Sequence, residues 1–256
     1  MTLHTLAIDS FRLALWLFIL CIVFIPLERL FTRQTERISR AQLFKDLALY
    51  FINGLLPAAL MSLPVAFIAR LSAHITPPQL SQSVAQLPLI ISFIAVFLIG
   101  EITFYWAHRL CHQIPLLWRF HALHHSAEHI HFLVNTRAHP ADIIFTRLFS
   151  IIPMYLLGFA GQANQAASPM LVIFIGVFWG FFLHANIRWR FGFIEKMIAT
   201  PAYHHWHHNQ NEKQNVNFAS MLPCLDLLFG SYFVPKVWPK SYGLAPVTTS
   251  TLSNDK

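Results

Sequence analysis

Long apolar runs dominate the chain and are separated by short polar connections. A helix needs about 20 predominantly apolar residues to cross the roughly 30 Å hydrocarbon core of a bilayer. Five runs reach or approach this length: 11–27, 47–69, 87–107, 143–160 and 170–187. The pattern therefore predicts an all-α integral membrane protein with four to five transmembrane or re-entrant helices.

Two places leave the number of spans open. The last two runs are the shortest, and the uncharged segment GQANQAASP (161–169) separates them, so they could form two spans or a re-entrant hairpin. The first run resembles a signal-peptide core, but Pro26, Glu28 and Arg29 follow it without a small-residue cleavage site. We therefore expect this run to remain as the first span.

The cations are distributed unevenly between the two faces of the predicted membrane region. The connection after the first run carries Arg29, Arg33, Arg37, Arg40 and Lys45, whereas the connection 70–86 carries only Arg70. Cytoplasmic loops are rich in Lys and Arg, so the first connection is expected in the cytoplasm, with the ends of the third and fifth runs on the same face. The net charge of +7 then reflects topology, and we expect no nucleic-acid partner.

The chain divides into N-terminal transmembrane helices (1–86), a segment with the chemistry-bearing motifs (87–235) and a C-terminal tail (236–256). The tail is polar after about Pro239, and we expect that part to be loose. Its three cysteines form no CxxC pair. This spacing argues against a disulfide scaffold, a cysteine zinc site and an iron–sulfur centre.

Histidines cluster in two windows, with eight of the fifteen between 108 and 139 and four between 204 and 208. They form the patterns HRLCH, HALHH and HHWHH, and residues three and four apart in a helix share one face. Imidazole suits iron, zinc, copper and nickel, and eight convergent rings exceed the four ligands of one tetrahedral ion. We therefore predict a cap that binds two metals at the cytoplasmic face. The predicted ligands are His108, His112, His121, His124, His125, His204, His207 and His208.

The helical register of HHWHH separates three ligands from two other side chains. His204, His207 and His208 fall on one face, so His205 is expected to face the membrane surface or solvent, and Trp206 to anchor at the interface. His184 ends the last run, where a ligand and an interfacial anchor fit equally well. Glu101 lies inside an apolar run, which is costly; it could support the metal site, line a substrate cavity or pair with a neighbouring helix.

The ordered motifs across residues 88–235 resemble the sterol desaturase and fatty acid hydroxylase superfamily. Besides the histidine patterns, the resemblance rests on HHS, RAHPAD, HANIR, TPAYHHWHH, NFA and LDLLFGSY. The chain departs from the family pattern at three positions, where Ala219 stands for Gly, Leu225 for Trp and Ser231 for Thr. These departures leave the predicted ligands intact.

The resemblance implies an integral membrane di-iron enzyme whose catalytic domain is the segment 87–235. Such an enzyme hydroxylates or desaturates a lipid with dioxygen and electrons. The resemblance adds His184 and His139 to the candidate ligands for two iron ions, which zinc can replace during purification. In this family-like context Asp142 could orient His139 or lie at the surface, and Asn186 could reach the metals or a bridging water. Asp226 could orient a ring of HHWHH or cap a turn. The electron donor would be separate, a b-type cytochrome or a ferredoxin system.

Two other functions remain as alternatives. A membrane metallohydrolase needs a general base beside a metal-bound water, and the chain has no HExxH motif. A metal transporter would place its ligands near the bilayer midplane, whereas these motifs follow the ends of spans. The short loops favour a bacterial inner membrane. The sequence leaves open whether the lipid is a sterol, a fatty acyl chain, an ether lipid or a carotenoid, and whether the reaction is hydroxylation or desaturation.

Overall fold

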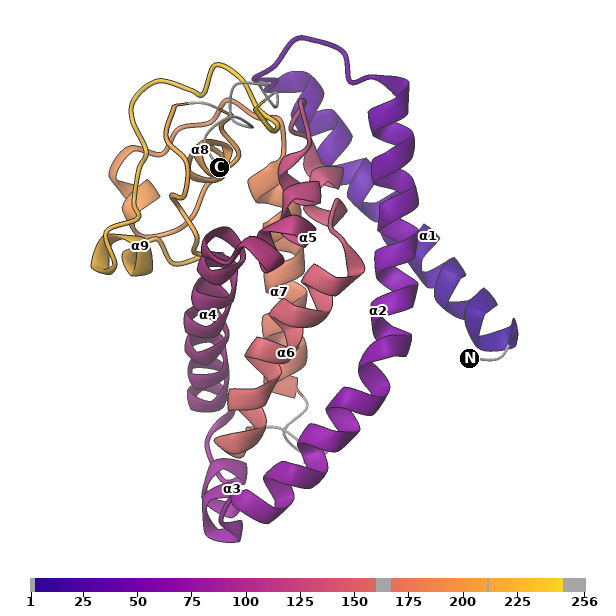
Figure 1. The fold of residues 1–256 in the computed structure, drawn as a ribbon, viewed down its shortest axis with the longest axis vertical. Helices are drawn as coiled ribbons and strands as arrows, with labels where there is room; N and C mark the ends of the chain where they lie inside the picture. Colours follow the sequence, from indigo (N-terminus) through magenta and orange to yellow (C-terminus); the bar gives the residue numbers. More distant parts are fainter. Residues whose placement is uncertain (1–2, 160–166, 211, 246–256) are drawn as a thin grey trace, which may run out of the picture.

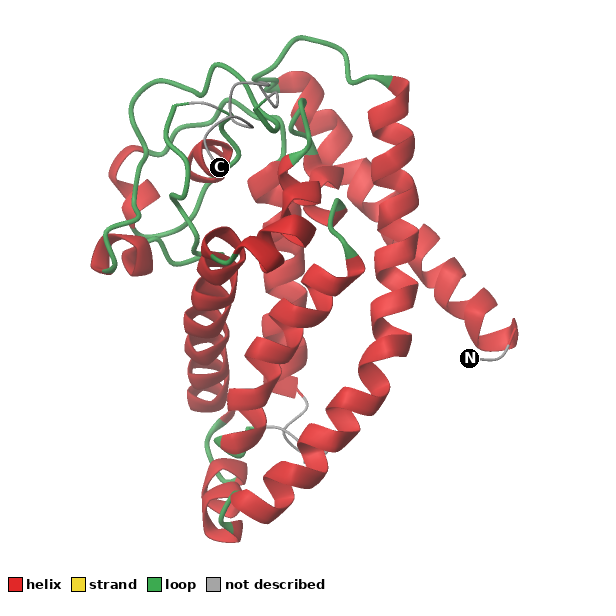
Figure 2. Cartoon of the chain, viewed as in Figure 1, coloured by secondary structure: helices red, strands yellow, loops and turns green. Residues whose placement is uncertain are grey.

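The computed structural model describes residues 3–159, 167–210 and 212–245, and the regular structure in these ranges is helical (Figures 1 and 2). The long helices are α1 (Leu3–Leu30), α2 (Arg40–Ile75), α4 (Leu89–Gln113), α6 (Pro140–Leu156) and α7 (Ala167–His184). The shorter elements are α3 (Pro78–Ala85), α5 (Pro115–His125), η1 (Phe132–Thr136), η3 (Gly192–Lys196), α8 (Pro201–His207) and α9 (Cys224–Leu228). The all-helical prediction is confirmed.

Four of these helices, α1, α2, α4 and α7, are long and apolar enough to cross a membrane. Large apolar side chains on them are exposed, for example Leu63 (80%) and Phe67 (66%), as expected for surfaces that face lipid. The fourth predicted run forms α6, which has 17 residues and is not among the four. It packs against α2 and α4 and runs antiparallel to α7 (Figure 1). Most of the predicted connection GQANQAASP lies outside the described residues.

Local sequence signals set where α5, α6 and α8 begin. Pro115, Pro140 and Pro201 occupy the first turns of α5, α6 and α8, respectively. Backbone N–H groups in a first turn have no partner within the helix, so proline loses no hydrogen bond there. Thr200 caps α8, since its side chain accepts a hydrogen bond from the Tyr203 N–H. These starts fix which faces of α5 and α8 the histidines occupy.

The connection between α1 and α2 lies at the same end of the molecule as the C-terminal ends of α4 and α7, α5 and α8, whereas α3 lies at the opposite end (Figure 1). The expectation that both histidine windows share one face with residues 28–46 therefore agrees with the fold. Between α1, α2, η1 and α7, a core that includes Leu20, Phe24, Tyr50, Phe132 and Phe181 holds the N-terminal helices to the rest.

The described part of the segment after residue 235 packs against the helical cap rather than lying loose. Tyr242 is buried, and Arg33 donates a hydrogen bond to the carbonyl of Pro239. The prediction of a loose tail is wrong for these residues, because aromatic side chains at 238 and 242 supply apolar surface to bury. Residues 246–256 lie outside the described ranges.

Candidate metal centre

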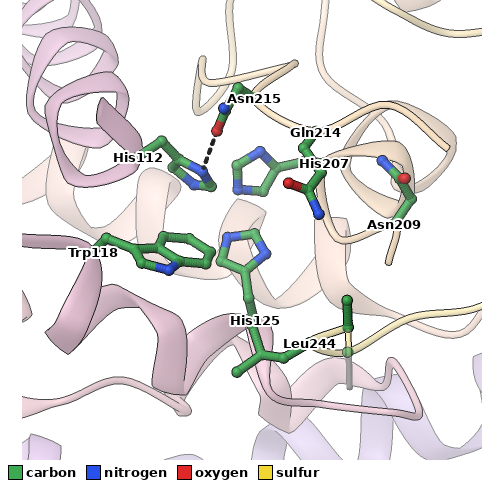
Figure 3. Close-up of a pocket in the computed structure, with 10 residues that line it drawn as sticks. His112, Trp118, His125, His207, Asn209, Gln214, Asn215 and Leu244 are labelled. Carbon is green, nitrogen blue, oxygen red and sulfur yellow. Dashed lines mark hydrogen bonds between the residues drawn. The ribbon is translucent and has the colours of Figure 1, made fainter. Parts of the chain in front are cut away.

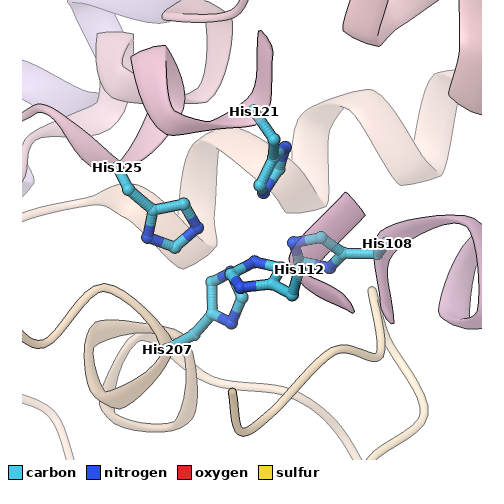
Figure 4. A group of neighbouring side chains, drawn as sticks. All are labelled: His108, His112, His121, His125 and His207. Atoms are coloured by element: carbon cyan, nitrogen blue, oxygen red, sulfur yellow. The ribbon is translucent and has the colours of Figure 1, made fainter. Parts of the chain in front are cut away.

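The structure brings nine histidines into two adjacent groups at the ends of α4 and α7. In each group, one potential ligand atom per residue lies within 4.8 Å of the others. The five-histidine group contains His108, His112, His121, His125 and His207 (Figure 4). The four-histidine group contains His124, His184, His204 and His208.

Each HxxHH motif contributes to both groups. In α5, His121 and His125 are one turn apart and join the five-histidine group, whereas His124 points into the other. At α8 the division is reversed, since His204 and His208 join the four-histidine group and His207 joins the five-histidine group. In HxxHH, the first and last histidines are four residues apart and share a helix face, whereas the middle histidine lies to one side of that face. The motif thus places two groups of potential metal ligands next to each other.

Backbone carbonyls fix the orientation and tautomer of four rings. The carbonyls of Phe218 and Val216 each lie 2.8 Å from the Nδ1 of His108 and His207, respectively. The carbonyl of Arg137 lies 3.1 Å from the Nδ1 of His124, and that of Gly180 lies 2.7 Å from the Nδ1 of His184. A carbonyl only accepts, so each Nδ1 carries the proton and donates it. In the neutral ring, the Nε2 lone pair is then free to bind a metal.

Side chains orient two further rings of the five-histidine group. His121 Nδ1 lies 3.0 Å from Asp142 Oδ2, and His112 Nδ1 lies 3.2 Å from Asn215 Oδ1. Asn215 has a φ of 59°, a left-handed conformation that Asn tolerates better than most residues. A carboxylate that accepts from a ligand histidine raises the basicity of the ring.

Unpartnered nitrogens show that a cation fits the five-histidine group. The Nε2 atoms of His112, His121, His125 and His207 are buried, and none has a hydrogen-bond partner. A buried polar atom without a partner costs about 1–3 kcal/mol. Four such atoms directed into one space are explained by a shared ion.

Close contacts between ring nitrogens show that a cation also fits the four-histidine group. His184 Nε2 lies 3.2 Å from His124 Nε2 and 2.9 Å from His204 Nε2. Since the Nδ1 atoms of His124 and His184 carry the protons, their Nε2 lone pairs face each other and repel unless a cation lies between them. An ion about 2.1 Å from each nitrogen separates its ligands by about 3.0–3.4 Å, close to these distances.

A proton is a poor candidate for that cation. Burial lowers the pKa of His124 to about 3 and holds the pKa of His204 and His208 well below the ordinary value. The rings therefore stay neutral at physiological pH, the form that ligates metals. A donor set made only of imidazole suits iron, zinc, copper or nickel.

Two cavities lie on different sides of the histidines. A largely apolar cavity of about 400 Å³ is lined by α4, α6 and α7 and reaches His108, His121, His124, His184 and His204. A more polar cavity of about 440 Å³ is lined by His112, Trp118, His125, His207 and loop residues (Figure 3). In this second cavity the Trp118 ring lies beside His112 and His125.

Comparison with known proteins identifies the family. Residues 93–231 match the model of the fatty acid hydroxylase family, and this match covers more than half of the chain. The chain belongs to the fatty acid hydroxylase family. The matched region contains all nine grouped histidines, so the resemblance drawn from the sequence motifs is confirmed.

Relatives of the chain are named for activities on different lipids. Ornithine lipid hydroxylase OlsE of Rhizobium tropici is 34% identical over 154 residues, which cover 59% of this chain and 44% of the relative. Alkylglycerol monooxygenase of Xenopus tropicalis is 28% identical over 155 residues, 60% of this chain and 33% of the relative. Methylsterol monooxygenase 2-2 of Arabidopsis thaliana is 25% identical over 210 residues, 81% and 75% of the two chains. The chain thus spans less than half the length of the first two. No solved structure matches.

Of the two candidate ligands added by the family resemblance, the structure brings in His184 and leaves His139 outside both groups. His139 caps α6, where its Nδ1 accepts a hydrogen bond from the Ala141 N–H at 3.1 Å, and its ring lies against Phe120. Asp142 contacts His121 rather than His139, because His139 precedes the helix and turns back over its first turn.

Glu101 and Asn186 both bind backbone N–H groups. Glu101 Oε2 accepts from Met221 and Leu222 at 2.8 and 3.0 Å, and the residue also lines the apolar cavity. Asn186 Oδ1 accepts from Gln34 at 2.7 Å and so ties the end of α7 to the connection after α1. Asn186 therefore does not face the histidine groups.

The HHWHH register agrees with the structure, but the predicted surroundings of its two other residues are wrong. His205 is fully buried, with its Nε2 donating to the Ala185 carbonyl and its Nδ1 accepting from the Tyr242 hydroxyl. Trp206 is 1% exposed and donates to the carbonyl of Val237. The chain after α7 and the C-terminal segment cover the outer face of α8, which a local pattern does not reveal.

Asp46 is a supporting residue that the sequence analysis did not identify. It is fully buried in α2 and accepts hydrogen bonds from Arg137 Nε at 2.5 Å and His131 Nε2 at 2.8 Å. Arg137 in turn offers the carbonyl that orients His124. The sequence signal that could have identified Asp46 is its place directly before the apolar run 47–69, where an unpaired carboxylate is energetically costly.

Asp226 holds the loop that orients the five-histidine group. Its carboxylate accepts from the N–H groups of Phe218 and Ala219, at 2.7 and 3.0 Å, and from the hydroxyls of Ser231 and Tyr203. Because the Phe218 carbonyl accepts from His108, Asp226 both stabilises a turn and helps to position a ring, and that ring belongs to HRLCH rather than to HHWHH.

Proposed function

We propose that the chain is a membrane-bound di-iron oxygenase that hydroxylates or desaturates a lipid with dioxygen and external electrons. The observation that carries the proposal is the pair of adjacent histidine groups, with free Nε2 lone pairs, at one end of an apolar cavity. The relatives named above are lipid hydroxylases and monooxygenases, which supports a lipid substrate.

In this proposal the five-histidine and four-histidine groups each hold one iron ion. Bound iron supplies the activation of dioxygen that attack on an unactivated C–H bond requires. The chain itself binds and orients the lipid between α4, α6 and α7, so that a carbon of the lipid lies beside His108, His121, His124, His184 and His204. The apolar lining excludes water from the reacting carbon.

Electrons would come from a separate donor, a b-type cytochrome or a ferredoxin system. The membrane would be a bacterial inner membrane with the histidines on the cytoplasmic side. The cation-rich connection 28–46 lies at the histidine end of the fold and supports this orientation.

Metal analysis combined with lipid analysis tests the proposal. The purified chain should bind about two metal ions, the number that a two-metal site needs. Cells with the active protein should contain an oxidised lipid that depends on iron and dioxygen, and cells with His121→Ala should lack it. One ion or fewer at full occupancy would contradict the dinuclear site. Lipid hydrolysis by a form containing only zinc would favour the metallohydrolase.

A further inference from the structure

Arg147 is a charged side chain in the apolar cavity without a protein partner. It lies in α6, lines the cavity together with apolar residues of α4 and α7, and is exposed. In the described part of the chain it makes no hydrogen bond or ion pair. Other arginines near the site are held, since Arg109 donates to Tyr105 and Arg137 to Asp46.

An unpaired guanidinium at this place is costly. Charged residues inside a membrane bundle are rare and usually pair with each other, with carbonyls or with a ligand. The two carboxylates in the same cavity are already used, because Glu101 binds the backbone at residues 221 and 222 and Asp142 binds His121. Neither carboxylate pairs with Arg147, so its positive charge is available to pair with an anionic group that enters the cavity.

We propose that Arg147 binds an anionic oxygen of the lipid that occupies this cavity, a carboxylate or a phosphate. Guanidinium presents a planar fork of donors that matches either anion. Ser150 lines the cavity one turn further along α6, and its hydroxyl has no partner in the described structure, so it supplies a second donor to the same anion.

Arg147 lies close along α6 to a residue that orients one of the grouped histidines. Arg147 follows Asp142 by five residues, which is about 7.5 Å along a helix. Asp142 holds His121 of the five-histidine group. The inference rests on the proposed function and narrows its substrate class to acidic lipids.

Binding of matched lipid probes tests the inference without turnover. The full-length protein in phosphatidylcholine nanodiscs, without reductant, receives photoactivatable probes with the same 16-carbon chain: a carboxylic acid, a monoacyl phosphate and a neutral alcohol. Labelled peptides are mapped, and competition gives the affinities. The acid or the phosphate should label the cavity segments of α4 or α7 and bind about tenfold more tightly than the alcohol, as expected for a charge-assisted hydrogen bond.

Variants assign the preference to Arg147. Arg147→Gln should lose the tenfold preference and keep its affinity for the alcohol, whereas Arg147→Lys should keep most of the preference. Arg70→Gln, at an exposed arginine of α2, is the matched control and should bind all probes as the unaltered protein does. Whichever of acid and phosphate depends more strongly on Arg147 identifies the anion.

Three results would overturn the inference: equal affinities of the unaltered protein for all three probes, equal weakening of acid and alcohol by Arg147→Gln, or the same effect from Arg70→Gln. The first comparison needs no variant, so it holds even if Arg147→Gln does not fold. A protein that binds acidic lipid through Arg147 but oxidises none would instead contradict the proposed function alone.

Discussion

Single residues in this protein act mainly by orienting rings whose Nε2 atoms would bind metal. His108, His124, His184 and His207 each donate Nδ1–H to a backbone carbonyl, and His121 uses Asp142. Each hydrogen bond selects one tautomer and one ring direction. Neighbouring histidines can therefore differ completely in role.

The pair His205 and His207 tests this distinction. His207→Ala removes a ring of the five-histidine group and should lower metal content and abolish activity. His205→Ala should keep the metal content of the folded protein, because the His205 ring binds Ala185 and Tyr242 instead. It should also destabilise the protein by about 1–3 kcal/mol, the cost of buried groups left without partners. Metal analysis and thermal unfolding separate these effects, and loss of metal in both variants would contradict the assignment.

Gly176 tests the apolar cavity at the residue scale. It lines the cavity, and a Cβ built on it would meet no atom within 4 Å. Gly176→Leu should therefore place its Cβ without a clash, extend the rest of its side chain into space meant for lipid, and gain about 1 kcal/mol in helix propensity. We expect unchanged metal content and a thermal stability at least equal to that of the unaltered protein, with strongly reduced lipid oxidation. Unchanged oxidation would show that the lipid uses another route.

At the scale of elements, α5 and α8 each contribute to both histidine groups, so a shift of either helix disturbs both groups. Their placement depends on contacts with distant elements. The loop 216–221 is held by Asp226 and offers carbonyls to His108 and His207, and α2 holds Arg137 through Asp46. The N-terminal helices thus support the metal centre as well as anchoring it.

Asp46 provides the prediction at this scale. Asp46→Asn keeps the side-chain size but removes the charge that faces Arg137 and His131. Leaving one partner of a buried ion pair alone costs about 3–5 kcal/mol. We expect lower stability and reduced metal occupancy in the four-histidine group, because the Arg137 carbonyl orients His124. Asp9→Asn, in an exposed pair with Arg12, is the control and should leave both unchanged.

In the whole molecule, the described helices place every grouped histidine at one end and α3 at the other (Figure 1). The apolar cavity approaches the histidines from among the membrane helices, and the polar cavity approaches them from the loops of the cap. A lipid and a polar reactant can therefore reach the same centre from different surroundings.

Cysteine labelling tests the orientation of the whole molecule. Gln82 in α3 and Glu212 in the cap are both exposed. In a background without Cys21 and Cys224, Gln82→Cys should react with an impermeant reagent from outside the cell, and Glu212→Cys only after permeabilisation. Labelling of both positions from the same side would contradict the shared-face topology.

The sequence by itself predicted the helical class, the four helices long and apolar enough to cross a membrane, and eight of the nine grouped histidines. These features depend on local spacing: apolar length predicts a span, and intervals of three and four residues place rings on one helix face. Its patterns also separated His205 from His204, His207 and His208, as the structure does, since the register of a short helix is local.

Only the tertiary structure decided how the histidines divide between two groups and what surrounds them. The assignment of His124 to one group and His125 to the other, the inclusion of His184, the capping role of His139 and the burial of His205 and Trp206 all depend on segments distant in sequence. Asp46 lies 91 residues from Arg137, and no local period encodes such a contact. Periodicity specifies which face a side chain occupies, whereas packing decides what that face meets.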